Sequence, residues 1–138
     1  MPALVLDASL AVAALLPDEA TDLIAEILPT ADADGIVVPA LWCTEVGNAV
    51  LTAERRGRLT TEERREGLAW LARLRLEVDA PSMILAWGRV LDLSQRHRLT
   101  LYDATYLELA MRGGSRLATL DRALRRAAVA EQVTLLPA

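Results

Sequence analysis

Residues 4–9 read LVLDAS, a short apolar run that ends at an aspartate and a serine. Residues 4–6 are typical of a buried strand, and the apolar residues of 9–16 are typical of a helix, which Pro17 should end. A strand that passes directly into a helix is the repeating unit of a parallel sheet covered by helices. We therefore expect Asp7 to lie at the carboxyl end of the first strand.

The rest of the chain continues this alternation of strands and helices. Further strands are expected at 35–39, 76–78, 116–120 and 133–136, and helices at 18–29, 40–56, 60–74, 81–95, 100–112 and 121–128. Such alternation predicts an α/β fold of three layers, in which helices cover both faces of a central, mainly parallel sheet. A length of 138 residues suits one domain that spans residues 1–138.

The composition excludes several classes of enzyme. All 15 basic residues are arginines, so the chain has no Walker lysine and no lysine for a Schiff base. The single histidine, His97, cannot form a two-histidine acid/base pair. It lies at a predicted helix end, where we interpret it as a side chain that is solvated or faces the helix dipole. A net charge of -4 argues weakly against a protein that coats nucleic acid by charge alone.

The amino terminus and the lone cysteine give two further expectations. No basic residue precedes the first apolar run, which Asp7 interrupts, so this segment fits neither a signal peptide nor a membrane span. We expect a cytoplasmic protein with no membrane contact. Cys43 has no partner for a disulfide or a metal site, and in a helix that is apolar on nearly every side it should be a small buried hydrophobe.

Three aspartates lie beside predicted strand ends or helix starts. Asp7 follows the first strand, Asp121 follows the fourth, and Asp103 lies in the first turn of a helix. Ligands collect at the carboxyl ends of the strands of an open parallel sheet, so these positions suit a binding site. Each aspartate also has an ordinary interpretation as a helix cap, and Thr100 with Asp103 would form a variant of the capping box.

Glu45 is the only charged residue from Gly35 to Ala53, within a helix that has almost no polar face. A bare buried carboxylate costs several kcal/mol, so a ligand or partner should neutralise it. Asn48, one turn later, is placed to orient Glu45 or its ligand water. The alternative is that Glu45 lies on an exposed face of the helix that is only one residue wide.

If the four acids meet, two carboxylates about 5 Å apart repel by roughly 3 kcal/mol at an effective dielectric near 20. A hard divalent cation would relieve that repulsion, and ligands that are all oxygen point to Mg²⁺ or Mn²⁺ rather than zinc. The expected reaction is hydrolysis of a phosphodiester by a metal-activated water.

Four segments together resemble one family, the VapC-type toxins of the PIN-domain ribonucleases. They read LVLDASLAVAALLPDE (4–19), VPALWCTEVGNAVL (38–51), LTLYDATYLELAMRGG (99–114) and LATLDRALRRAA (117–128). The resemblance implies a PIN fold, endoribonuclease activity and an acidic metal site. It assigns the catalytic and metal-binding roles to Asp7, Glu45, Asp103 and Asp121, and supporting roles to Ser9, Thr119 and Asn48. Ser9 also fits a helix cap and Thr119 an ordinary strand residue.

The resemblance further implies partners. They are an RNA substrate, either transfer or ribosomal RNA, and a cognate VapB-type antitoxin that occludes the site, often with a basic side chain. Such toxins form homodimers, and Trp42, Trp70 and Trp87 are candidate interface residues, although they could equally fill the core of a chain without phenylalanine. The candidate RNA contacts are Arg55, Arg56, Arg58, Arg64 and Arg65. The alternative is that these arginines only form a solvated helix face.

Other classes of protein are also possible. Receiver domains and haloacid-dehalogenase-type phosphatases place an Asp after the first strand, but both need a lysine. A PIN-like module that binds RNA or a partner without cutting predicts an eroded set of acids. A purely structural domain, in which the acids are caps and surface residues, predicts that divalent metal leaves thermal stability unchanged.

Overall fold

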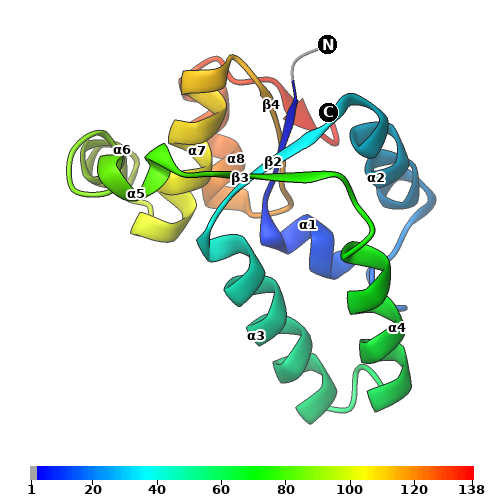
Figure 1. The fold of residues 1–138 in the computed structure, drawn as a ribbon. Helices are drawn as coiled ribbons and strands as arrows, with labels where there is room; N and C mark the ends of the chain where they lie inside the picture. The colour runs from blue at the N-terminus through cyan, green and yellow to red at the C-terminus, as the bar shows by residue number, and fades with distance from the viewer. Residues whose placement is uncertain (1–2) are drawn as a thin grey trace.

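The central sheet has five strands, in the order β3-β2-β1-β4-β5, and every neighbouring pair is parallel (Figure 1). A computed structural model describes residues 3–138, which form these strands and eight helices. The strands are β1 (Leu4–Leu6), β2 (Ile36–Pro39), β3 (Leu76–Asp79), β4 (Arg116–Ala118) and β5 (Leu135–Leu136). The predicted α/β fold with a central parallel sheet is confirmed.

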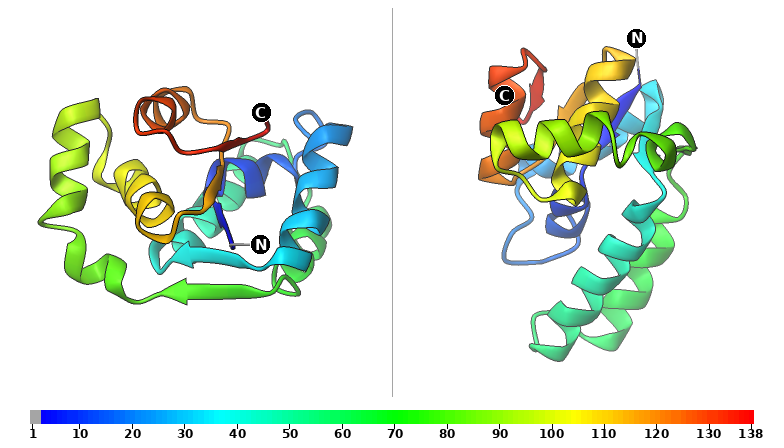
Figure 2. Two further views of the ribbon diagram at one scale, coloured as in Figure 1. Left: turned by 90° about the horizontal axis from the view of Figure 1, so that it is seen from above. Right: turned by 90° about the vertical axis from the view of Figure 1, so that its left-hand side faces the viewer.

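Helices cover both faces of this sheet, which explains why β1 is an uninterrupted apolar run with no exposed residue. The helices are α1 (Ala8–Ala13), α2 (Asp22–Asp34), α3 (Leu41–Arg55), α4 (Thr61–Leu71), α5 (Pro81–Leu85), α6 (Arg89–His97), α7 (Leu101–Gly113) and α8 (Arg122–Ala130). Helix α7 packs on β1, β2 and β4 and contacts α6 and α8, whereas α1 and α2 lie across the sheet from it (Figure 2). The α3–α4 hairpin projects away from the sheet (Figure 1).

The direction of winding changes between β1 and β4. The chain moves from β1 outward through β2 to β3, and then crosses back to β4 on the other side of β1. In sheets of this kind the crevice for a ligand opens at the carboxyl ends of the two strands where the order reverses. Asp7 continues the pairing there, because its N–H donates to the carbonyl of Ala118 at 2.9 Å.

Helix α2 differs from the prediction at both ends. It begins at Asp22 with Thr21 as its cap, because Asp18 and Glu19 form ion pairs with Arg58 instead of capping a helix. It also continues through Pro29 to Asp34. Proline removes a hydrogen bond within a helix, and here the buried residues Ile24, Ile27, Leu28 and Ala31 hold both halves of the helix against the core.

Two other expectations need correction. The single helix predicted over 81–95 is two helices, because residues 86–88 form a turn that ends at Gly88. Helix α3 buries only one face, and Cys43 lies on its exposed side, so the prediction of a buried cysteine is wrong. Trp42 belongs to the core, Trp70 is partly exposed and Trp87 is 89% exposed. Across residues 3–138, no helix is long and apolar enough to cross a membrane.

Candidate metal and active site

Asp7 lies at the centre of the crevice, directly after β1, with only 4% of its surface exposed. Its Oδ2 accepts hydrogen bonds from Ser9 Oγ at 2.6 Å and from Thr119 Oγ1 at 2.7 Å. Burial raises the pKa of Asp7, the two hydroxyl donors oppose that rise, and the nearby charge of Asp121 adds to it. The carboxylate is thus oriented by neutral donors and lies near another acid, and none of the ion pairs within residues 3–138 includes it.

The two hydroxyl residues also join the ends of β1 and β4. Ser9 Oγ accepts the N–H of Leu120 at 3.1 Å, and Thr119 Oγ1 accepts the N–H of Asp121 at 3.1 Å. The hydroxyls themselves are 3.3 Å apart. Thr119 lies just after β4, so its interpretation as a strand residue is wrong, and Ser9 lies inside α1 rather than at its cap. Each bonds the side chain of Asp7 and the backbone of the β4–α8 junction.

Asp121 is both a helix cap and a neighbour of the other acids. Its Oδ1 accepts the N–H of Leu124 at 2.8 Å, which caps α8, so the capping interpretation is correct for this residue. Its charge also raises the pKa values of Asp7 and Asp103. One carboxylate oxygen accepts the capping hydrogen bond, and the negative charge of the group still affects the acids of the crevice.

Asp103 lies in the first turn of α7, where Thr100 Oγ1 accepts its backbone N–H at 3.1 Å. The Thr100 side chain also acts on the carboxyl group, because its hydrogen bond lowers the pKa of Asp103. Burial raises the pKa of Asp103 to about 6, with further contributions from the charges of Asp121 and Asp7. Three aspartates from β1, α7 and the β4–α8 junction therefore share one electrostatic environment.

Glu45 comes from α3 and is held by a residue that the sequence did not point to. Tyr106, fully buried on α7, donates its hydroxyl to Glu45 Oε1 at 2.8 Å. Burial raises the pKa of Glu45, the tyrosine bond lowers it, and the charges of Asp7 and Asp103 raise it again. The available signal was spacing, because Tyr106 follows Asp103 by three residues and so shares its helix face.

Among residues 3–138, no hydrogen bond joins Asn48 to the four acids, but Asn48 lines the same cleft as Glu45 and Ser9. This cleft, about 480 Å³ in volume, opens between α1 and α3. Asn48 is exposed one helical turn beyond Glu45, so its amide is accessible to whatever enters.

The four acids fit a hard cation by the chemistry of their donors. All are carboxylates, three have raised pKa values, and each of those three is raised in part by another member of the set. Among residues 3–138, no three Asp, Glu, His or Cys side chains stand close enough together to ligate one ion as they are placed here. The site therefore has the oxygen donors and the unbalanced charge that favour Mg²⁺ or Mn²⁺, without a closed set of ligands.

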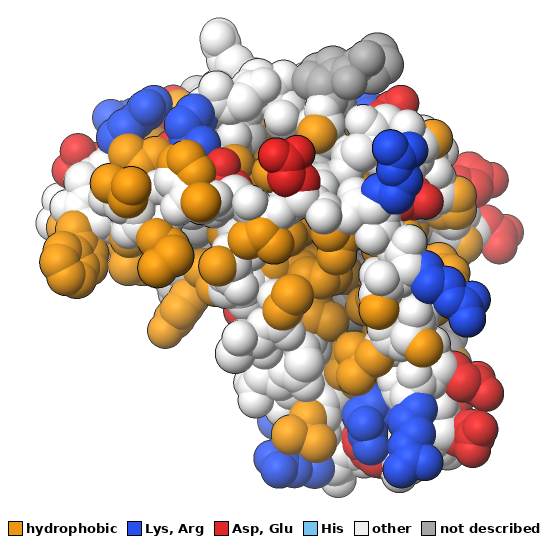
Figure 3. Space-filling view, viewed as in Figure 1, with side chains coloured by type: hydrophobic (Ala, Val, Ile, Leu, Met, Phe, Trp, Pro, Cys, Tyr) orange, Lys and Arg blue, Asp and Glu red, His pale blue; other side chains and the backbone are white. Residues whose placement is uncertain are grey.

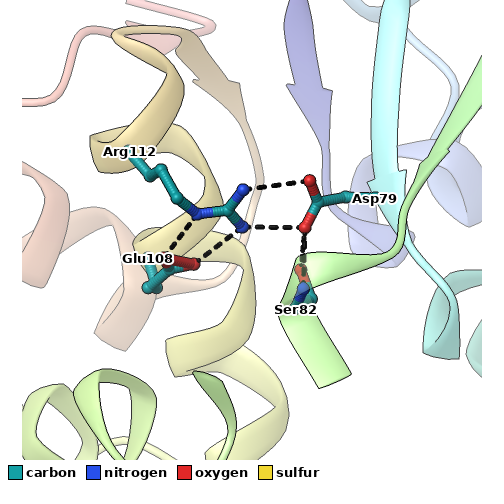
Figure 4. Close-up of polar contacts among 4 residues, drawn as sticks. All are labelled: Asp79, Ser82, Glu108 and Arg112. Atoms are coloured by element: carbon teal, nitrogen blue, oxygen red, sulfur yellow. Dashed lines mark hydrogen bonds and ion pairs between the residues drawn. The ribbon is translucent and has the colours of Figure 1, made fainter. Parts of the chain in front are cut away.

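A second polar cluster contrasts with this site because an arginine pairs with its carboxylates (Figure 4). Arg112 forms ion pairs with Glu108 on its own helix and with Asp79 at the end of β3, both at 2.7 Å. The Arg112 guanidinium lowers the pKa of Asp79, which also accepts hydrogen bonds from Ser82. Glu108 is fully buried. The cluster fastens the edge strand to α7, and both of its carboxylates already have a cation as partner.

Comparison with solved structures gives similar folds over nearly the whole chain. The chain is similar to PAE2754 from Pyrobaculum aerophilum, with 22% identity, a TM-score of 0.64, and 97% of this chain and 83% of that one covered. It is similar to VapBC2 from Rickettsia felis, solved bound to a DNA fragment from their promoter, with 17% identity, a TM-score of 0.65 and 96% of each chain covered.

A third solved structure, FitAcB from Neisseria gonorrhoeae, is similar with 15% identity, a TM-score of 0.64, and 96% of this chain and 95% of that one covered. At these identities the likeness shows the fold. No curated protein matches the sequence. The family model of the PIN domain matches residues 4–130, which is most of the chain and includes all four acids. The protein therefore belongs to the PIN domain family.

Proposed function

We propose that this PIN domain is a metal-dependent endoribonuclease and the toxin component of a type II toxin–antitoxin system. The observation that carries the proposal is the mutual effect of the acids, since Asp7, Glu45 and Asp103 each have a pKa raised by another of them. A structural domain gains nothing from gathering like charges at the reversal point of its sheet. A phosphodiesterase that uses a divalent cation requires such a site.

In this proposal Asp7, Glu45, Asp103 and Asp121 hold Mg²⁺ or Mn²⁺ and carry catalysis. When bound, the cation would supply positive charge for the scissile phosphate and lower the pKa of an attacking water. Asp7 is held in one orientation by its two hydroxyl donors, so its second oxygen is left for a ligand. Tyr106 holds Glu45 Oε1 by a hydrogen bond that opposes the rise in the pKa of Glu45 caused by burial. Asn48 is placed to orient a substrate or a water in the cleft.

A cleavage assay on total RNA with Mg²⁺ or Mn²⁺, mapped at nucleotide resolution, tests this function. We expect discrete cuts by the purified protein, and loss of cutting with EDTA or in Asp103→Asn. The matched control is Asp92→Asn, because Asp92 is an exposed residue in the first turn of α6. Equal cleavage by the parent and Asp103→Asn would remove Asp103 from the site.

The proposed partners follow from the same site. An RNA substrate, either transfer or ribosomal RNA, implies a cytoplasmic location. A VapB-type antitoxin with a basic side chain would complement the acids electrostatically. Co-expression with the protein encoded beside it should therefore yield a complex that no longer cuts RNA. An equally active complex would count against occlusion of the site.

We also propose that the protein forms a homodimer. Met83, Ile84 and Trp87 are 74%, 84% and 89% exposed, which is unusual for such large apolar side chains. On the same face, an apolar groove of about 200 Å³ lies between α3, α4 and β3 and includes Trp42 and Leu71 (Figure 3). A two-fold dimer needs a self-complementary surface. The exposed side chains of Met83, Ile84 and Trp87 and the apolar groove on the same face provide the two parts of such a surface.

Sedimentation measurements can test the dimer. Trp87→Ser should shift the protein to monomer at micromolar concentration. Leu23→Ser removes an apolar residue that is 55% exposed on α2, outside this surface, and should leave the dimer intact. A monomeric parent protein would overturn the proposal.

A further inference from the structure

Of the four acids, Glu45 lines the cleft between α1 and α3, and the cleft extends well beyond it. Ser9 and Glu45 line one end of it, and Arg56 and Arg58 line the other. Helix α3 forms one wall over this whole length, which at 1.5 Å per residue is about 16 Å. A site for metal and one phosphate needs only the first end, so the remaining length calls for a different occupant.

The α3 wall carries a polar stripe, beside which Ala49 and Ala53 also line the cleft. Glu45, Asn48, Thr52 and Arg56 follow one another at helical spacing, and all four line the cleft. The stripe therefore offers a carboxylate, an amide, a hydroxyl and a guanidinium in sequence.

The opposite wall, from α1 and the residues after it, is largely apolar. Ala8 and Val12 line it from one face of α1, and Leu16 lines it just after the helix, with the polar residues Ser9 and Glu19 beside them. One polar wall and one apolar wall suit a strand that is charged along one side and less polar along the other.

The free positive charge of this cleft is concentrated on Arg56. Arg58 is held by Asp18 and Glu19 at 3.1 and 2.9 Å, so its charge is largely balanced. Of the ion pairs formed within residues 3–138, none involves Arg56, which is exposed.

Apart from Arg56 and Arg58, the arginines of the α3–α4 hairpin do not line the cleft. Basic side chains gather at the far end of the α3–α4 hairpin (Figure 3). Arg55 and Arg65 are exposed but lie outside the cleft lining, and Arg64 pairs with Glu54.

From this placement we infer that the cleft binds the sugar-phosphate backbone of a single-stranded RNA segment beside the cleavage site, with Arg56 holding a phosphate a few nucleotides away. The inference rests on the proposed ribonuclease function. The cleft lies between two helices and none of the residues that line it is aromatic. Recognition there is therefore of phosphate and sugar rather than by base stacking, and it adds affinity with little sequence preference.

Equilibrium binding to a labelled single-stranded RNA of about ten nucleotides tests the inference. Titrations are made in the Asp103→Asn background with Mg²⁺, so that the RNA stays intact, at salt concentrations from about 50 to 200 mM. Arg56→Gln should weaken binding by about 3- to 10-fold and reduce the slope of log affinity against log salt by about 0.7, the value for one lost phosphate contact on a single strand.

Two further variants separate this contact from a general effect of charge. Thr52→Val, in the middle of the stripe, should weaken binding without changing the salt slope, because it removes a neutral hydroxyl. Arg73→Gln removes an exposed arginine just beyond the end of α4 and outside the cleft, and should bind as the background protein does.

The outcomes distinguish this inference from the proposed function. If the parent protein cuts RNA but Arg56→Gln and Arg73→Gln bind it equally, the inference alone is overturned. The same holds if Arg56→Gln keeps its RNA affinity and instead loses a protein partner. If the parent protein neither cuts nor binds RNA, the proposed function fails as well.

Discussion

Tyr106 donates its hydroxyl to Glu45 across 61 residues of sequence, and in doing so joins α7 to α3 beside the acids. This bond lowers the pKa of Glu45, which burial otherwise raises. Tyr106→Phe should therefore raise that pKa further and move the acid limb of the cleavage profile to higher pH. Loss of the bond should also cost about 1 kcal/mol in the free energy of unfolding.

The matched control for Tyr106→Phe is Tyr102→Phe on the same helix, because Tyr102 is 62% exposed. Its pH profile should coincide with that of the parent protein. If the Tyr106→Phe profile also coincided with the parent's, the tyrosine would not govern the charge of Glu45.

Asp103→Asn should stabilise the metal-free protein at neutral pH. A carboxyl whose pKa rises from 3.8 to about 6 holds its proton more tightly when folded, so stability is highest below the unfolded pKa and falls as pH rises through 6. A pKa shift of this size means that the charged carboxylate destabilises the fold by about 3 kcal/mol at neutral pH before any discount. Solvent screening and the favourable position of a negative charge at a helix start reduce that destabilisation. Asparagine should therefore raise the free energy of unfolding by about 1 kcal/mol.

Denaturation in EDTA at pH 7 and again near pH 4 measures this effect. The gain should be present at neutral pH and absent near pH 4, where Asp103 is protonated in the folded parent protein. A variant less stable than the parent at pH 7 would show that the aspartate stabilises the fold rather than straining it.

Divalent metal should raise the melting temperature. For a dissociation constant of about 1 mM, about 10 mM Mn²⁺ adds roughly 1.4 kcal/mol, which corresponds to about 5 °C for a chain of this size. Sodium chloride of matched ionic strength is the control for screening. Asp103→Asn should lose most of the shift, and no shift in the parent protein would argue strongly against the metal site.

Arg112→Met should destabilise the fold without metal being involved. The change leaves Glu108 fully buried beside Asp79 with no cation, which costs about 3–5 kcal/mol in a broken buried pair. Arg126→Met, an exposed change on α8, should stay within about 0.5 kcal/mol of the parent protein in urea denaturation. If Glu108→Gln restores part of the loss in a double variant, the buried charge is its cause.

Much of the fold could be predicted because its signals are local. The apolar run before Asp7 and the breakers around the other strands indicate where each strand ends and its helix begins. The errors arise where tertiary contacts override such signals. Asp18 and Glu19 resemble a helix start, but Arg58, 40 and 39 residues away, pairs with them. Pro29 lies inside α2 because the helix is held by what it buries.

The aspartates of the site could be located from sequence because parallel strands share one carboxyl edge. Their partners could not, since hydrogen bonds from Tyr106 to Glu45 and from Arg112 to Asp79 depend on how α7 packs against other elements. For Glu108 the sequence does carry a signal. It lies four residues before Arg112 among the apolar residues 107–111, a spacing that indicates an ion pair on one helix face.

The pairing of β4 with β1 has a consequence for synthesis of the protein. Asp7 and its donor Thr119 lie 112 residues apart, and Asp121 follows still later. A ribosome-bound chain that has not yet released β4 lacks the strand that completes the crevice, and a fragment truncated before it cannot gather the four acids. Any activity that needs them begins only after residue 121 has been synthesised and β4 has paired with β1, so a shorter product lacks that activity.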